Sequence, residues 1–205
     1  MSAQIAGDTG VLVEVDEAKN LQVFQTHPGY PSAGGWYSVA GRSGTAAIAA
    51  ALATDTSLMS ARLSVSSTRR AYIMRMRVNM GTLTAGAAGG VPSILGLQRF
   101  NGATPSGGVQ RTAARFALSK GSASDITDIR DNNAALTMTS VAFLDEIAWT
   151  LTPTNGAGVS NYDWIMEPDA PIELAPGEGL CLRTRQVGPA TATWFFTYSM
   201  YWYER

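Results

Sequence analysis

The stretch Ala71-Tyr-Ile-Met-Arg-Met-Arg-Val-Asn-Met80 alternates between two kinds of side chain. One set of alternate positions is Tyr72, Met74, Met76, Val78 and Met80. The other set is Ile73, Arg75, Arg77 and Asn79. Because successive side chains of a strand point to opposite faces, this period of two predicts a β-strand. We expect its methionine-rich face to point inward and its arginines to point outward.

The C-terminal stretch, residues 191–203, repeats this alternation. One face is Ala192, Trp194, Phe196, Tyr198, Met200 and Trp202, and the other is Thr191, Thr193, Phe195, Thr197, Ser199, Tyr201 and Tyr203. An aromatic side chain buries roughly 150–250 Å² at ~25 cal/mol per Å², so burying the first face is strongly favourable. We therefore predict a central strand.

Weaker alternation predicts further strands, and we expect eight or so in all. They are 21–25, 36–39, 59–65 with Met59, Ala61, Leu63 and Val65 inward, 94–100, part of 109–118, 147–151 and 180–185. Turn-rich stretches separate them: 28–31, 81–92, 101–108, 152–156 and 175–179. The one expected helix is short and Ala-rich, over 45–53. The sequence thus predicts an all-β fold, an antiparallel β-sandwich of jelly-roll type with at most one short helix.

Composition limits the function classes. The chain has 205 residues, enough for one domain with a buried core, and only 15% of them are charged. Cys181 is the only cysteine and His27 the only histidine, which excludes disulfide frameworks and multi-histidine metal sites. A net charge of −1 argues against a nucleic-acid partner bound through overall positive charge. We expect no cofactor and no metal.

Two long uncharged stretches, 78–98 and 186–203, approach the ~20 residues that a bilayer-spanning helix needs. Glycines and Pro92 interrupt the first, and the second alternates hydroxyl and aromatic side chains. We expect neither to span a membrane. The first residues also lack the basic start and apolar run of a secretory signal.

Charge is segregated along the chain. Residues 56–120 hold nine basic side chains and no acidic one, whereas residues 121–182 hold ten acidic side chains and only Arg130 as a base. These halves can pair within one sandwich or across a subunit boundary. The excess of arginine, which is enriched at protein interfaces, leads us to favour subunit contacts.

The motifs for catalysis are incomplete. Asp8-Thr9-Gly10 matches the aspartic protease tripeptide, but only seven residues precede Asp8 and no second such tripeptide follows. Gly41-Arg-Ser-Gly44 is not a nucleophile elbow. His27 and Cys181 are the only members of a potential nucleophilic pair, and Cys181 lies between two leucines, so we predict a packed thiol. We predict no catalytic residues and a protein that is not an enzyme.

Two other groups of residues invite a binding role. Asp125, Asp128, Asp131 and Asn132 are oxygen ligands of the kind that calcium prefers, but their spacing fits no EF-hand, so we interpret them as turns in a solvated loop. The carboxylate pairs Asp145-Glu146 and Glu167-Pro-Asp169 are interpreted as surface charge. The aromatic group near loops is Trp36, Tyr37, Tyr162 and Trp164, which can stack on sugars or cap a sandwich core.

The order of several segments resembles a family. They are Tyr37-Ser-Val-Ala-Gly41, Ala46–Thr54, Leu58-Met-Ser-Ala-Arg62, Arg70-Ala-Tyr-Ile-Met-Arg75, Asp125-Ile-Thr-Asp-Ile-Arg130, Pro171-Ile-Glu-Leu-Ala-Pro-Gly-Glu-Gly179 and Trp202-Tyr-Glu204. In this order the chain resembles small structural proteins of tailed bacteriophages, of the virion decoration or fibre type, over residues 36–204. The resemblance implies a β-sandwich that assembles on the virion, commonly as a trimer.

The leading hypothesis is a non-enzymatic bacteriophage virion protein that decorates or cements the capsid through protein–protein contacts. We expect a homotrimer, with the major capsid protein or neighbouring virion proteins as partners, in a virion assembled in the host cytoplasm. The alternative is a tail-fibre or receptor-binding module that contacts host glycans through Trp36 or Trp164. Residues 1–20 are predicted to be an N-terminal arm reaching a neighbouring subunit, and residues 21–205 a single sandwich domain.

Overall fold

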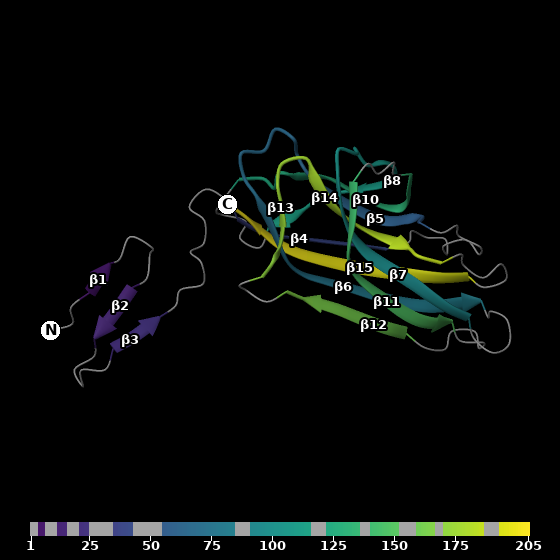
Figure 1. The fold of residues 1–205 in the computed structure, drawn as a ribbon, viewed down its shortest axis with the longest axis horizontal. Helices are drawn as coiled ribbons and strands as arrows, with labels where there is room; N and C mark the ends of the chain where they lie inside the picture. The colour runs from purple at the N-terminus through teal and green to yellow at the C-terminus, as the bar shows by residue number, and fades with distance from the viewer. Residues whose placement is uncertain are drawn as a thin grey trace.

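The computed structural model describes residues 4–6, 12–15, 21–24, 35–42, 55–84, 91–115, 122–135, 140–151, 159–166, 170–186 and 193–205. These residues contain fifteen strands in three antiparallel sheets, and none of them is helical (Figure 1). The all-β antiparallel sandwich is therefore confirmed. The helix expected at 45–53 lies outside the described residues. No described segment forms a helix long and apolar enough to cross a bilayer.

The first large sheet holds six strands. They are β5 (Ser57–Leu63), β7 (Val91–Asn101), β8 (Ser106–Arg111), β10 (Ile126–Ala135), β11 (Ser140–Leu151) and β14 (Glu178–Thr184). Their order across the sheet is β11-β7-β14-β5-β10-β8.

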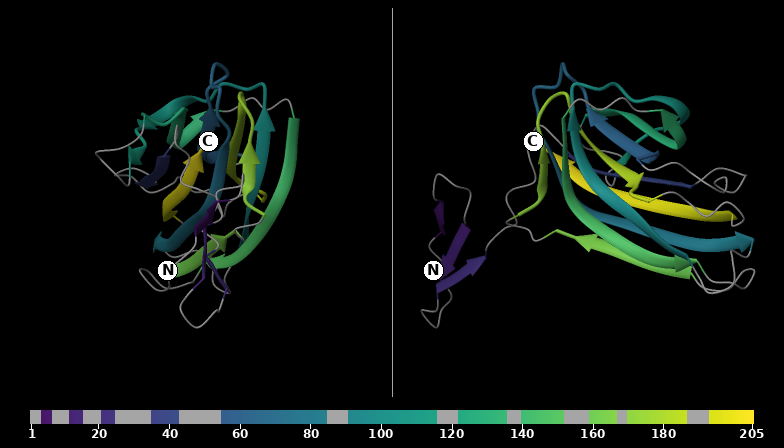
Figure 2. Two further views of the ribbon diagram at one scale, coloured as in Figure 1. Left: turned by 90° about the vertical axis from the view of Figure 1, so that its left-hand side faces the viewer. Right: turned by 45° about the vertical axis from the view of Figure 1, so that its right-hand side comes forward.

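The second large sheet packs against the first, and Figure 2 shows the two as curved layers. Its strands are β4 (Gly35–Arg42), β6 (Ala71–Thr84), β9 (Ala114–Arg115), β12 (Val159–Ile165), β13 (Ile172–Leu174) and β15 (Thr193–Glu204). The order is β12-β6-β15-β4-β9, and β13 pairs with the start of β6.

A third, small sheet stands apart from the sandwich in Figure 1. It consists of β1 (Gln4–Ala6), β2 (Leu12–Val15) and β3 (Leu21–Phe24) in that order. The strand expected at 21–25 is present, but β3 pairs with β2 and not with either large sheet. The division into an arm and one sandwich domain stays a prediction.

The C-terminal strand is central, as predicted. β15 lies between β6 and β4, with five inward side chains at most 2% exposed: Trp194, Phe196, Tyr198, Met200 and Trp202. They join one core with apolar side chains from both large sheets, including Leu63, Leu97 and Ile129. Alternation of apolar and polar residues therefore identified the strand that the sandwich is built around.

The predicted face of the β6 strand is wrong in its first half. Met76, Val78 and Met80 are buried in the core as expected, but so are Ala71 and Ile73, while Met74 is half-buried. The register against β15 shifts here, because Arg75 pairs with Tyr201 and Ile73 with Trp202. This β-bulge adds one residue and reverses the alternation on one side of it.

The predicted limits of two other segments are also corrected. Val65 was expected to face inward, but β5 ends at Leu63 and Val65 is 66% exposed in the turn that follows. The turn-rich stretch 81–92 is shorter than expected, because β6 continues to Thr84 and β7 begins at Val91. Gly81 belongs to the strand: a Cβ there would lie 2.5 Å from the Phe195 ring, so its role is close packing.

The aspartate-rich segment is a strand and not a solvated loop. Asp128 and Asp131 lie in β10, and Asp131 is completely buried between the sheets. A register shift between Ile126 and Asp128 breaks the period of two, which explains why the sequence pattern did not reveal this strand. Strands β1, β2, β12 and β13 were likewise not predicted, so the total exceeds the eight or so expected.

The segregated charges pair within the chain, which corrects the preference for subunit contacts. In the part of the chain that the structure describes, seven basic residues of 56–115 form ion pairs with carboxylates of 121–182. The pairs are Arg62–Asp128, Arg69–Asp125, Arg70–Glu173, Arg75–Asp163, Arg77–Asp163, Arg99–Glu178 and Arg111–Asp131. The sandwich brings the two halves together because its long-range strand pairing places early strands beside late ones.

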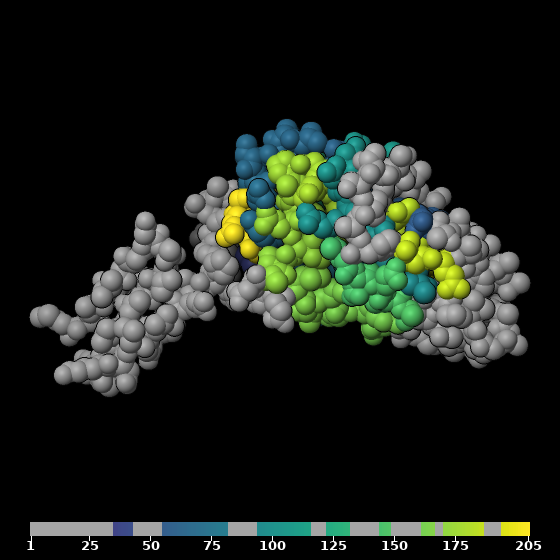
Figure 3. Space-filling view, viewed as in Figure 1, coloured from purple at the N-terminus to yellow at the C-terminus, as the bar shows by residue number. Residues whose placement is uncertain are grey.

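Both sides of the sandwich are closed. On one side the chain crosses from β8 in the first sheet to β9 in the second. On the other, side chains of β12 reach β11: the Trp164 indole donates to the Asp145 carboxylate and the Tyr162 hydroxyl to the Ala148 carbonyl. In Figure 3 the green atoms of these two strands lie against each other along the lower edge. Such closure protects edge strands from unwanted pairing.

Candidate functional site

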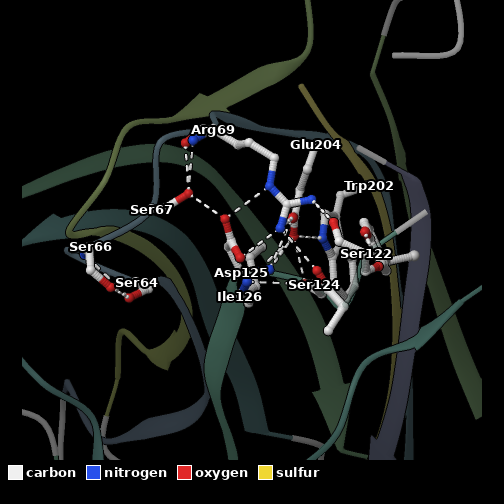
Figure 4. Close-up of polar contacts among 12 residues, drawn as sticks. Ser64, Ser66, Ser67, Arg69, Ser122, Ser124, Asp125, Ile126, Trp202 and Glu204 are labelled. Atoms are coloured by element: carbon white, nitrogen blue, oxygen red, sulfur yellow. Dashed lines mark hydrogen bonds and ion pairs between the residues drawn. The ribbon is translucent and has the colours of Figure 1, made fainter. Parts of the chain in front are cut away.

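A polar cluster forms where three segments meet at one end of the sandwich (Figure 4). The first is the serine-rich connection 64–70 between β5 and β6, the second is 122–125 before β10, and the third is the end of β15. The backbone groups of Arg70 and Arg205 pair with each other, which holds the first segment against the third. We call Arg69, Asp125 and Glu204 the Arg69 cluster.

The guanidinium of Arg69 uses all its nitrogens. Nε donates to Asp125 Oδ2 over 2.9 Å, and Nη2 lies 2.6 Å from Asp125 Oδ1 and 3.2 Å from Glu204 Oε2. Nη1 donates to Ser122 Oγ and Nη2 to the Ala123 carbonyl. The hydrogen bond from Arg69 lowers the pKa of Asp125, against the opposing effect of burial. The planar fork of arginine is suited to such a multidentate arrangement.

Glu204 is the most buried member, with a side chain that is 0% exposed. Its carboxylate accepts hydrogen bonds from the backbone N–H of Asp125 over 2.9 Å, from Ser124 Oγ over 2.6 Å and from Trp202 Nε1 over 3.0 Å. A buried charge is tolerated only when it is paired and hydrogen-bonded, and here both conditions hold. Glu204 therefore fixes the start of β10 to the end of the central strand.

An open recess of about 550 Å³ lies beside the Arg69 cluster. It is lined by Ser64, Ser66, Ser67, Thr68, Arg69, Ser122, Asp125 and Thr127. Six of these eight residues carry hydroxyl groups, which both donate and accept hydrogen bonds. Asp125 presents a carboxylate whose lowered pKa keeps it ionised at neutral pH, so it accepts hydrogen bonds and does not act as a general base there. The recess can bind polar, hydroxyl-bearing groups.

A second charged group lies on the outer surface of the second sheet, where Arg75 and Arg77 both pair with Asp163. These side chains are 36%, 43% and 30% exposed respectively. The hydrogen bond from Arg75 lowers the pKa of Asp163. We call these three residues the Asp163 cluster.

A third carboxylate, Asp131, is enclosed between the sheets. Its Oδ2 accepts from Arg111 Nε over 2.7 Å and from the Tyr198 hydroxyl over 3.3 Å, while its Oδ1 is buried without a hydrogen-bond partner. Gly41 allows this approach, because a Cβ there would lie 2.2 Å from Asp131 Oδ2. Burial raises the pKa of Tyr198, so its hydroxyl stays protonated and donates.

Cys181 is a packed thiol, as the sequence predicted. It is 0% exposed in β14, where it packs with Phe100 and Ala103 beneath the connection from β7 to β8. Arg62 Nη1 donates to Thr104 Oγ1 and thereby holds that connection over the sheet. Burial raises the pKa of the thiol to about 12, which removes the thiolate needed for a nucleophile.

The other sequence candidates are dispersed or not described. Asp8-Thr9-Gly10, His27 and Glu167-Pro-Asp169 lie outside the described residues. Asp145 and Glu146 are exposed on β11, where they accept from Trp164 and Arg185. Trp36 lies on β4 and Trp164 on β12, at separate places in the sheet order, and Tyr37 is buried in the core against Trp202. The four aromatic residues do not form one platform.

Sequence reasoning missed the Arg69 cluster, although one signal for it was present. The inward positions of β15 continue from Trp202 to Glu204, which places a carboxylate on the buried face. A charge at a core position requires a cation nearby. Continuing the alternation by one step would have predicted a buried ion pair there.

Comparisons with known proteins leave the family open. No protein-family model matches the chain, and no curated protein does. Among solved structures the chain is compared with one described as the structure of infectious bursal disease virus Gx strain, at 13% identity and a TM-score of 0.19. That match covers 94% of this chain and spans 46% of the other chain.

Proposed function

We propose that this protein is a non-enzymatic structural protein of a bacteriophage virion, which decorates or cements the capsid through protein–protein contacts. The observation that supports an adhesive role is the outer face of the second sheet. We call it the arginine face, and it consists of Ser38, Ala40, Arg42, Arg75, Arg77, Asn79, Asp163, Thr197, Ser199 and Tyr201. These side chains alternate with core residues along each strand, and all are half-buried or exposed.

The strand register arranges this face in rows. One row runs from Asp163 through Arg77 and Ser199 to Ala40, and the next from Arg75 through Tyr201 to Ser38. Small side chains in the middle leave the arginines and Tyr201 as the prominent groups. Arginine and tyrosine are enriched where proteins bind one another, which favours a protein partner for this face.

The virion assignment is supported by the segment order described above, and adhesion needs no catalytic group. Several weak contacts around a symmetry axis reinforce one another through their effective concentration, so a homotrimer with modest patches holds a capsid firmly.

The decisive experiment uses capsids that lack this protein. Purified full-length chain is mixed with them, and bound protein is measured after sedimentation, together with the temperature at which the capsids release their nucleic acid. We expect saturable binding and a higher release temperature. Absence of binding at micromolar concentration would refute the capsid role.

A second candidate function, a receptor-binding module for host glycans, is favoured by the hydroxyl-lined recess. Its volume of about 550 Å³ lies within the range of small-ligand sites, and its hydroxyls and the Asp125 carboxylate match the hydrogen-bonding groups of a sugar. A glycan array separates the two functions. Binding that is lost in Ser67→Ala and Thr68→Val, but kept when Trp164 is replaced by phenylalanine, would favour the recess over the tryptophans.

A further inference from the structure

The recess beside the Arg69 cluster carries more negative than positive charge. Among the described residues that line it, Arg69 is the only cation and Asp125 the only anion. Glu204 lies behind the same guanidinium, because Arg69 Nη2 is 2.6 Å from Asp125 Oδ1 and 3.2 Å from Glu204 Oε2. One guanidinium therefore serves two carboxylates, and the Arg69 cluster keeps one uncompensated negative charge.

The two cations that adjoin the cluster in the sequence do not supply the missing positive charge. Arg70 pairs with Glu173. The guanidinium of Arg205 lies over the Tyr72 ring, 4.7 Å from the ring centroid. The excess negative charge of the Arg69 cluster therefore remains at the recess.

Asp125 is the member of the cluster that presents this charge to the recess. Its side chain is 30% exposed, whereas that of Glu204 is 0% exposed. Oδ2 accepts from Ser67 Oγ over 2.7 Å and from Arg69 Nε over 2.9 Å. Oδ1 has only Arg69 Nη2 as a polar partner among the described residues, and Figure 4 shows the carboxylate between Ser67 and Arg69. Because a carboxylate oxygen accepts two hydrogen bonds, Oδ1 retains one acceptor position for a ligand.

An anionic ligand is disfavoured at this position. All three nitrogens of the Arg69 guanidinium already donate to protein groups, which are Asp125, Ser122 and the Ala123 carbonyl. A phosphate, a sulfate or an acidic sugar would also meet the negative charge of Asp125, and like charges in contact oppose binding. The recess therefore differs from an arginine-based anion site, in which the guanidinium turns its donors to the ligand.

The hydroxyl groups of the recess complement a ligand that carries both a cation and hydroxyls. Ser66, Thr68, Ser122 and Thr127 are exposed there, and a hydroxyl group both donates and accepts. An ammonium group has three donors and no acceptor, so it pairs with the Asp125 carboxylate and with hydroxyl oxygens. Ring hydroxyls need partners of both kinds, which the same side chains supply.

We propose that the recess binds an amino sugar, with its ammonium group on Asp125 and its ring hydroxyls on the surrounding serines and threonines. The inference rests on the second candidate function, the glycan-binding recess, and names the class of sugar that the recess selects. It is independent of capsid binding. Neutral sugars bind more weakly, because the charge of Asp125 then has no partner in the ligand.

The test compares three β-1,4-linked disaccharides that share one ring skeleton and differ in the group on the second ring carbon. They carry an amine (glucosamine), an acetylated amine (N-acetylglucosamine) or a hydroxyl (cellobiose). Dissociation constants for the full-length chain are measured by saturation-transfer NMR at pH 6, where such amines are protonated. We expect the amine to bind at least about fivefold more tightly than the other two in 50 mM NaCl. In 500 mM NaCl this ratio should shrink, because salt screens a partly exposed pair.

Two carboxylate variants locate the effect. Asp125→Asn keeps the size of the side chain and removes its charge, so the amine should then bind no more tightly than cellobiose. Asp55→Asn is the matched control, because Asp55 precedes the start of β5 and the recess lies beyond its end. The Asp55 side chain is 44% exposed, and its φ of 63° is one that asparagine adopts. The preference for the amine should be unchanged in Asp55→Asn.

A second pair of variants serves if Asp125→Asn does not fold, which circular dichroism melting reveals. Thr68→Lys places an ammonium group in the recess, and Thr68→Gln is a neutral replacement of similar length. We expect the amine to bind at least about fivefold more weakly to Thr68→Lys than to Thr68→Gln, because like charges repel. Cellobiose should bind the two variants to a similar extent.

Three outcomes would overturn the inference: equal binding of the amine and cellobiose to the wild type, a preference for the amine that persists in Asp125→Asn, or tighter binding of the acetylated disaccharide than of the amine. In each of these cases a sugar still binds, so the glycan function stands and only the class of sugar fails. Binding of none of the three up to about 10 mM would refute both the glycan function and this inference.

Discussion

The Arg69 cluster and the Asp163 cluster contain the same groups in opposite proportion and in opposite surroundings. In the first, one arginine bridges two carboxylates, of which Glu204 is 0% exposed. In the second, two arginines share one carboxylate, and the three side chains are 30–43% exposed. The number of ion pairs is similar, but only the first cluster is closed off from water.

This difference decides what each cluster contributes. Exposed ion pairs add roughly 0–1 kcal/mol, because water and salt screen them and long side chains lose freedom. A buried pair contributes little relative to an apolar replacement, but removing one partner is costly because the other charge is left without compensation. The Arg69 cluster thus stabilises one particular arrangement of three segments, whereas the Asp163 cluster remains available for a partner.

The largest effect is expected at Glu204. Glu204→Ala leaves Arg69 facing an empty position and also removes the acceptor of four neutral donors, so we expect a loss of about 3–5 kcal/mol in the free energy of unfolding. Urea denaturation followed by tryptophan fluorescence measures it. Glu204→Gln is the matched control: its amide oxygen still accepts from Asp125 N–H and Trp202, so it should lose less. A loss below ~1 kcal/mol in Glu204→Ala would contradict the assigned role.

Replacement of Arg69 should cost about as much as replacement of Glu204. Arg69→Met leaves the fully buried Glu204 carboxylate hydrogen-bonded to neutral donors but without its cation, and it also removes the partner of Asp125, whose side chain is 30% exposed. We expect a loss of about 3 kcal/mol in the free energy of unfolding, because a buried charge is left without compensation. Arg69→Lys should restore only part, because a single ammonium group cannot span both carboxylates and Ser122. Full stability in Arg69→Lys would show that charge alone matters.

The dependence of stability on acidic pH tests whether Asp125 stabilises the fold through its ion pair with Arg69. Its pKa is lowered in the folded state by the hydrogen bond from Arg69, so its contribution to stability is present above the unfolded-state pKa of about 4 and is lost as the pH falls below that value. In Asp125→Asn the free energy of unfolding should therefore fall less steeply below about pH 4. Between pH 6 and pH 8 its pH dependence should match that of the wild type. Melting temperatures measured from pH 7 to pH 2 test this. If the melting temperature of Asp125→Asn fell below pH 4 as steeply as that of the wild type, the role of the Arg69–Asp125 ion pair would be contradicted.

Sequence patterns predicted the parts of this molecule in which hydrophobic alternation is uninterrupted. β15 alternates from Trp194 to Trp202 without a break, and its central position followed directly. In β6 and β10 a bulge adds one residue and interrupts the period of two. The sequence pattern therefore placed Ile73 on the wrong face and led to the interpretation of β10 as a loop. A bulge depends on the partner strand, which sequence does not identify.

Local sequence patterns could not predict the charged clusters either, because their members come from distant parts of the sequence. Arg69 and Glu204 are 135 positions apart in the sequence and meet only because the backbone of Arg70 pairs with that of Arg205. The segregation of basic and acidic halves was visible, but its consequence depended on strand order. Once β12 lies beside β6 and β10 beside β5, the opposite charges face each other within one chain.

The smallest effect is expected at Asp163, and it sharpens the comparison most. Asp163→Asn should lower the free energy of unfolding by no more than about 1 kcal/mol, and 0.5 M NaCl should remove even that difference. The same salt should leave the loss in Glu204→Ala largely intact, because buried charges are screened much less. Urea denaturation of both variants at 20 mM and 500 mM NaCl provides the test. If salt reduces both losses equally, burial does not distinguish the clusters; if only Asp163→Asn responds, the arginines of the outer face are held loosely enough to meet an acidic partner.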